Sequence, residues 1–107
     1  MQPQTLEAIA DYDVAVDLDP KYGEAYYSRG NAYKSLGKYQ EALADHTKAI
    51  ELNSGYSGFY INRAIVYGKL GRTEAAKQDL RKAVELEPEL KPRVRELARH
   101  FRLNLGL

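Results

Sequence analysis

The chain of 107 residues is long enough for one domain with a modest core, and its net charge of +1 favours neither nucleic acid nor a membrane surface. The absence of cysteine excludes disulfides, a thiol nucleophile and a zinc finger, and it suits the cytoplasm, where we expect the protein. We expect no membrane span and no signal peptide, because no run approaches ~18 apolar residues and the first residues lack a basic region followed by an apolar one.

The first predicted helix covers residues 5–18, where the apolar side chains have amphipathic spacing and Pro20 follows. Two pairs of helices are then predicted, at about residues 24–36 and 39–52, and at about residues 58–70 and 73–86. Within each pair, a glycine lies between the two helices and can take the left-handed conformation that ends a helix. A last helix is predicted over residues 91–105. The short connections favour antiparallel hairpins.

Residues 23–56 and 57–90 are two copies of one pattern, related by a shift of 34 positions. A fixed period of this length is typical of helical repeat arrays. Residues 5–18 align with the second helix of the first copy, so we interpret them as the second helix of a repeat whose first helix is missing. Residues 91–105 continue the pattern as a first helix that caps the last hairpin. The recurring residues include Tyr26 and Tyr60, Arg29 and Arg63, Tyr33 and Tyr67, Gly37 and Gly71, Ala42 and Ala76, Asp45 and Asp79, and Ala49 and Ala83.

At these positions the chain resembles the tetratricopeptide repeat family, whose pattern is an aromatic, a small residue, a second aromatic, an alanine, a large residue and a closing proline. The first copy has Tyr26, Gly30, Tyr33, Ala42, His46 and Ser54 there, and the second has Tyr60, Ala64, Tyr67, Ala76, Leu80 and Pro88. The departures are Tyr for the usual Trp, Arg29 and Arg63 where Leu is common, and Ser54 for Pro.

The resemblance implies an all-α fold in which antiparallel helix hairpins stack as a right-handed solenoid. The single domain would cover residues 1–107, with an orphan second helix (5–18), two repeats (23–56 and 57–90) and a C-terminal capping helix (91–105). It also implies a non-enzymatic scaffold for protein–protein interaction. We expect no catalytic residues, cofactor or metal, because the sequence shows no acid pair, nucleophile arrangement, phosphate-binding loop or metal-ligand spacing.

Two sets of polar residues lie at packing positions. His46 occupies the family's large buried position, so we expect a packed histidine and not a catalytic base. Arg29 and Arg63 recur in step with Asp45 and Asp79, which predicts one ion pair inside each repeat that aligns its helices. The alternative is that these arginines bind a ligand.

By the same resemblance, the first helix of each pair lines a peptide-binding groove. Amides there could hydrogen-bond an extended peptide, and cations would favour an acidic segment. Members that bind chaperone tails hold a terminal carboxylate with two asparagines and three cations. Asn31 and Asn62 match the asparagines, but Tyr27, Pro92 and Glu96 stand at the cationic positions, so this clamp is incomplete. The expected groove residues are Tyr27, Asn31, Lys34, Asn62, Ile65, Lys69, Arg95 and Arg99.

Gly58 and Gly68 are unusual because glycine inside a helix costs about 1 kcal/mol relative to alanine. They either open room for a ligand in the groove or are simply tolerated.

The chain ends carry opposite charges: residues 1–20 hold five acidic and no basic residues, and residues 91–107 hold five basic and one acidic. This pattern predicts an alternative function, self-association end to end or by swapped ends, without a dedicated peptide ligand. The apolar residues expected to meet are Leu6, Ala8, Ile9 and Ala15 of one molecule and Val94, Leu97, Ala98 and Phe101 of the next. A second alternative is that the chain was cut from a longer array and its first helix frays.

The expected partner is therefore a protein or peptide, acidic in character, or a second copy of the chain. The basic C-terminal residues are the only support for nucleic acid, and they lack the interleaved aromatic platform of single-strand binders. We expect neither a nucleic-acid nor a membrane partner.

Overall fold

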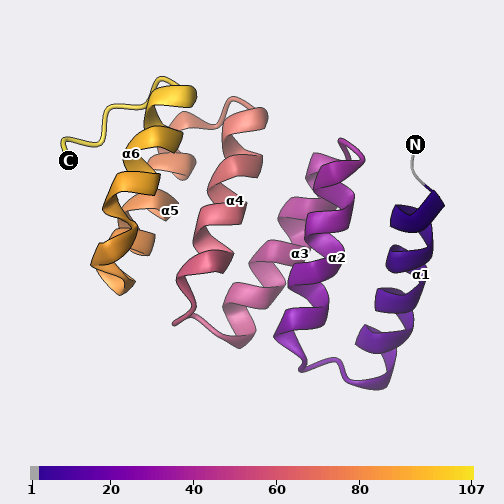
Figure 1. The fold of residues 1–107 in the computed structure, drawn as a ribbon. Coiled ribbons are helices and arrows are strands. Elements are labelled where there is room, and N and C mark those ends of the chain that lie inside the picture. Colours follow the sequence, from indigo (N-terminus) through magenta and orange to yellow (C-terminus); the bar gives the residue numbers. More distant parts are fainter. Residues whose placement is uncertain (1–2) are drawn as a thin grey trace. The chain divides into compact units, whose positions relative to one another are not determined.

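The computed structural model describes residues 3–107, and every regular element in that range is a helix (Figure 1). The helices form two compact units, one that ends at Ser54 and one that runs from Gly55 to Leu107. None of the helices within residues 3–107 is long and apolar enough to cross a membrane.

The first unit contains α1 (Pro3–Leu18), α2 (Gly23–Ser35) and α3 (Tyr39–Leu52). The helices α2 and α3 form a hairpin, and α1 packs beside α2 (Figure 1). On α3, the buried residues Ala42, Asp45, His46 and Ala49 follow the spacing of a single helix face. Ala42 and Ala49 have no exposed surface, so small side chains lie at the centre of this buried face.

The second unit contains α4 (Ser57–Lys69), α5 (Thr73–Leu86), the short 3₁₀-helix η1 (Pro88–Leu90) and α6 (Lys91–His100). The helices α4 and α5 repeat the hairpin, and α6 packs against α5. The buried residues of α5 are Ala76, Asp79, Leu80 and Ala83, the same face as on α3. The largest fully buried side chains of this unit are Phe59, Val66, Leu80 and Val94.

Both hairpin turns are closed by a glycine with positive φ, +75° at Gly37 and +73° at Gly71. After Gly37, the N–H of Lys38 reaches back to the carbonyl of Tyr33 at 2.9 Å, and Arg72 makes the same bond to Tyr67. These bonds satisfy carbonyls that the end of a helix leaves without partners, and the left-handed residue they require favours glycine. The turn residues chosen from the sequence are therefore confirmed.

The helices match the predicted ranges at 39–52 and 73–86, whereas α2 and α4 lie one residue earlier than predicted and α1 begins two residues earlier. The prediction for residues 91–105 is wrong at its end, because α6 stops at His100. Arg102 takes the left-handed conformation (φ 57°), and the N–H of Leu103 bonds the carbonyl of Ala98 at 2.7 Å. This is the same closing turn with arginine in place of glycine, so the sequence carried no signal for it. That residues 1–107 form a single domain stays a prediction.

Candidate functional site

Each repeat contains the predicted ion pair. Arg29 Nε and Nη2 donate to the two carboxylate oxygens of Asp45, both at 2.8 Å. In the second repeat, Arg63 Nε and Nη2 donate to the two carboxylate oxygens of Asp79, at 2.8 and 2.7 Å. Hydrogen bonds to the aspartates raise the pKa of both guanidinium groups, against the opposing effect of burial. Since these guanidinium groups are held inside the hairpins, they tie the first helix to the second in each repeat.

Arg29 also has a partner outside its own hairpin. Arg29 Nη1 also donates to Asp13 of α1 at 2.9 Å, which the sequence analysis did not predict. The equivalent positions of the other repeats hold Thr47 and Arg81, so no repeat pattern pointed to an acid there. Burial raises the pKa of the nearby Tyr33 hydroxyl above its ordinary value, and the negative charge of Asp13 raises it further.

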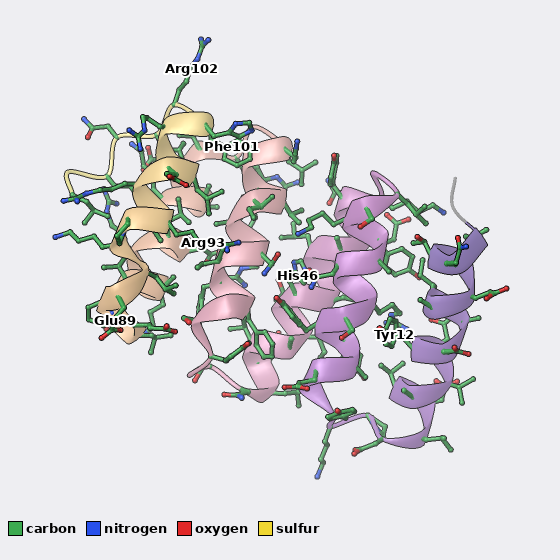
Figure 2. The ribbon with its side chains drawn as sticks, viewed as in Figure 1. Tyr12, His46, Glu89, Arg93, Phe101 and Arg102 are labelled. Carbon is green, nitrogen blue, oxygen red and sulfur yellow. The ribbon has the colours of Figure 1, made fainter. Side chains whose placement is uncertain are left out.

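In the first unit, the expected groove residues Tyr27, Asn31 and Lys34 lie half-buried along α2. Of these, Tyr27 and Asn31 contact His46 of α3, which has no exposed surface and is labelled in Figure 2. His46 Nε2 lies 2.9 Å from Asn31 Oδ1, and its ring centroid lies 5.6 Å from that of Tyr27. The prediction that His46 is buried is confirmed, but its bond to a groove residue was missed because alignment to the family treats this position only as a packing position.

Gly30 makes room for this histidine. A Cβ atom built on Gly30 would lie 2.6 Å from Cδ2 and 2.9 Å from Nε2 of His46. Separations this short do not occur between real atoms, so the imidazole and the absence of a side chain at residue 30 depend on each other.

In the second unit, Asn62, Ile65 and Lys69 lie on α4. Asn62 is half-buried and its Nδ2 donates to the carbonyl of Gly58, one turn earlier, at 3.0 Å. Ile65 is half-buried and Lys69 is exposed. The position on α5 that corresponds to His46 holds the buried Leu80, so this repeat has an apolar contact where the first has a polar one.

Arg95 and Arg99 are exposed on α6 and line an open hollow of about 320 Å³. The other side of the hollow is the C-terminal segment, including Leu103 and Leu105. The predicted helix over residues 91–105 includes residues 103–105, so the position of this segment beside the arginines was not expected.

The two unusual glycines accommodate aromatic rings of their own unit. A Cβ atom on Gly68 would lie 2.7 Å from the Phe101 ring, and Figure 2 shows Phe101 beside the end of α4. A Cβ atom on Gly58 would lie 3.0 Å from the Tyr56 ring. Neither expected alternative therefore describes Gly68, because Phe101 occupies the room that it opens.

The C-terminal set of residues expected to mediate self-association lies largely inside the second unit. Val94 is 0% exposed and Ala98 is 6% exposed, while Leu97 and Phe101 are half-buried. This corrects the proposed contact, because α6 already uses its apolar face to cover the hairpin beneath it. In the first unit, Ile9 is buried, Ala8 and Ala15 are half-buried, and Leu6 remains 45% exposed.

Within residues 3–107, no group of His, Asp and Glu side chains is arranged to hold a metal ion.

Three models of the tetratricopeptide repeat match the chain, at residues 4–37, 23–56 and 57–90. The matches at 23–56 and 57–90 coincide with the two copies found from the 34-residue shift.

Several solved structures of tetratricopeptide repeat domains are also similar to this chain. The first TPR of Spaghetti (RPAP3), bound to the HSP90 peptide SRMEEVD, has a TM-score of 0.82 at 30% identity over 92% of this chain and 81% of its own. The Arabidopsis OM64 TPR domain has a TM-score of 0.85 at 28% identity, with the same coverage. The Yersinia enterocolitica translocator chaperone SycD, with a TM-score of 0.84 over 92% of this chain and 72% of its own, is 19% identical and bears on the fold alone.

A shorter sequence match is to serine/threonine-protein phosphatase T of Trypanosoma brucei brucei. It is 44% identical over 34 residues, which are 32% of this chain and 7% of the phosphatase. A match of this length corresponds to about one repeat and carries no information on phosphatase chemistry.

Proposed function

Since the chain belongs to the tetratricopeptide repeat family, we propose that it is a non-enzymatic interaction scaffold that binds a peptide segment through the exposed faces of its first helices. The observation that carries the proposal is the arrangement on α2, where Asn31 and Lys34 lie one turn apart beside Tyr27. An amide, a cation and an aromatic ring are side chains that can hydrogen-bond and pack against an extended peptide.

The similarity to a repeat domain that holds the peptide SRMEEVD supports a peptide ligand for this chain. The chain lacks the three cations of the chaperone-tail clamp, since Tyr27, Pro92 and Glu96 stand at those positions. Its own cations are Lys34, Lys69, Arg95 and Arg99, which favour an acidic segment without requiring a terminal carboxylate.

A peptide array screened with the purified chain tests this proposal. We expect acidic peptides to bind, and the double substitution Asn31→Ala and Asn62→Ala to weaken them by roughly tenfold, because each amide contributes on the order of 1 kcal/mol or less to binding. The matched control is Gln40→Ala with Gln78→Ala, which removes two exposed amides from the second helices. Equal binding by wild type and the asparagine variant would show that these faces do not bind the peptide.

A second candidate function, self-association, is favoured by the outer face of α1. Leu6 is 45% exposed and Val14 is 57% exposed. The equivalent residues of the other second helices are Gln40 and Glu74, and Lys48 and Lys82, which are polar or charged. Exposed apolar groups of this kind often mark contacts with other proteins, and the acidic α1 complements the exposed Arg95 and Arg99 of a second copy.

Sedimentation velocity over a range of protein and salt concentrations tests this second candidate. We expect a salt-sensitive association that is lost in the variant Leu6→Gln with Val14→Lys, which carries the residues found at the same positions of α3. A monomer at every protein concentration would exclude the contact and leave the peptide proposal unaffected.

A further inference from the structure

The side-chain amide of Asn31 is held in one orientation. Its Oδ1 atom lies 2.9 Å from Nε2 of His46. An amide oxygen can only accept a hydrogen bond, so Nε2 of the imidazole carries the proton and donates it. The Nδ2 group of Asn31, with its two N–H donors, is then the part of the amide left for a ligand.

The imidazole that holds the amide is itself fixed by its surroundings. His46 is 0% exposed, and its ring is packed against the Tyr27 ring and the bare Cα of Gly30. A buried ring in contact on these sides has little freedom to rotate. The donor on α2 is therefore oriented before any ligand arrives, which lowers the entropy lost on binding.

The second repeat shows that the hairpin does not need this arrangement. At the positions of Gly30, Asn31 and His46 it has Ala64, Ile65 and Leu80. Ala64 and Leu80 are buried at 2% and 1% exposure, so the same hairpin packs well with an apolar set. The polar set of the first repeat therefore does more than fill space.

We infer that His46 is a positioning residue that makes the Asn31 site selective for hydrogen-bond acceptors. The site takes a peptide carbonyl or a side-chain carboxylate, because the Nδ2 group of Asn31, which is not the atom bonded to His46, offers two N–H donors. Lys34, one turn further along α2, adds a positive charge that favours a carboxylate. This inference rests on the proposed function, in which α2 contacts a peptide.

The first test is the tautomer of His46, measured by long-range ¹H–¹⁵N correlation spectra of the imidazole at neutral pH, where no peptide is needed. We expect the proton on Nε2, and a change in the Asn31 side-chain amide signals in His46→Leu. A proton on Nδ1 alone would make Nε2 an acceptor, reverse the amide, and overturn the inference.

The second test measures binding of the peptide SRMEEVD. We expect His46→Leu to weaken it about tenfold, as Asn31→Ala does, because a freed amide no longer presents its donors. The double variant should be no weaker than Asn31→Ala alone, and His46→Gln, which keeps an N–H donor, should recover part of the affinity. If His46→Leu is poorly folded, Gly30→Ala with His46→Leu replaces it, since this pair reproduces Ala64 and Leu80.

Wild-type affinity in a well-folded His46→Leu variant would overturn the inference even if the tautomer is as expected. Failure of the proposed function looks different: SRMEEVD would bind equally to wild type and Asn31→Ala, or to neither. In that case the tautomer measurement alone decides how the Asn31 amide is oriented.

Discussion

The two complete repeats share a frame but differ in what fills it. Both have a glycine turn, a pair of buried alanines on the second helix and an arginine bound by two hydrogen bonds to an aspartate. Inside this frame the first repeat has Asn31 and His46, whereas the second has Ile65 and Leu80. Since the same turn, alanines and Arg–Asp pair occur with either set, these residues are free to differ between the repeats. The polar set of the first repeat is therefore the candidate for a functional role.

The surroundings of the two arginines differ in the same way. Arg29 has a second acidic partner, Asp13, and lies 5.7 Å from the Tyr26 ring. The Cζ atom of Arg63, which forms an ion pair with Asp79, lies 6.0 and 5.6 Å from the ring centroids of Tyr60 and Tyr67. Asp13 therefore adds a second negative charge beside Arg29, and two tyrosine rings lie beside Arg63.

The largest expected effect separates these two pairs. Asp79→Ala should lower the free energy of unfolding by about 3 kcal/mol, because it removes the two hydrogen bonds that the carboxylate accepts from a largely buried guanidinium. Asp45→Ala should cost less, about 2 kcal/mol, because Arg29 keeps its bond to Asp13. Urea unfolding followed by circular dichroism measures both.

Asp13→Ala is the control for this prediction. Asp13 is about half exposed, so its removal alone should cost less than about 1 kcal/mol. In the Asp45→Ala background the same change should cost more, because Arg29 then loses its remaining partner. Equal costs for Asp45→Ala and Asp79→Ala would show that the difference between the two pairs has no energetic meaning.

The next effect concerns the residues inside the frame. Gly30→Ala should destabilise the protein by roughly 2 kcal/mol, because the added methyl group overlaps the buried imidazole of His46. In the His46→Leu background the same change should instead stabilise by about 1 kcal/mol, the ordinary gain of alanine over glycine in a helix. The double-mutant cycle in thermal unfolding gives the coupling between the two positions. Additive effects would mean that Gly30 and His46 are independent and that the second repeat is no guide to the first.

These contrasts explain what the sequence could predict. The repeat spacing gave the hairpins, the glycine turns and both Arg–Asp pairs, because each depends on residues that recur every 34 positions. Contacts made by only one repeat could not be found this way. Asp13 on Arg29 and Asn31 on His46 are such contacts, and they join residues that the repeat pattern leaves unspecified.

The chain terminus was mispredicted for a related reason. A left-handed arginine at residue 102 closes α6, although glycine is the usual signal for such a turn. As a result the extended segment after Arg102 returns beside Arg95 and Arg99 and forms the hollow there. The backbone bond from the N–H of Leu103 to the carbonyl of Ala98 closes this turn, and local propensity does not predict such a turn at an arginine.

A smaller effect tests whether α6 takes part in the packing of the second repeat. Gly68→Ala brings a methyl group to within 2.7 Å of the Phe101 ring and should cost about 1 kcal/mol net of the gain in helix propensity. The first repeat has Lys34 at this position, so the glycine is specific to the second repeat. With Phe101→Ala in place, Gly68→Ala should become stabilising in the same unfolding assay. A loss of stability in both backgrounds would exclude Phe101 as the reason for the glycine.

The smallest effect returns to the charge beside Arg29. The pKa of Tyr33 is raised above its ordinary 10.0, first by burial and then by the negative charge of Asp13, so the folded protein holds this proton more tightly than the unfolded chain. The contribution of Tyr33 to the free energy of unfolding is therefore fully present below pH 10 and is lost as the pH rises from there through the folded pKa. Because one proton is involved, the free energy of unfolding falls by no more than about 1.4 kcal/mol per pH unit. Tyr33→Phe should flatten this alkaline decline in urea unfolding, and Asp13→Asn should flatten it less, since burial is the larger cause. An unchanged decline in Tyr33→Phe would mean that other groups control alkaline stability and that Asp13 distinguishes the first repeat only through its bond to Arg29.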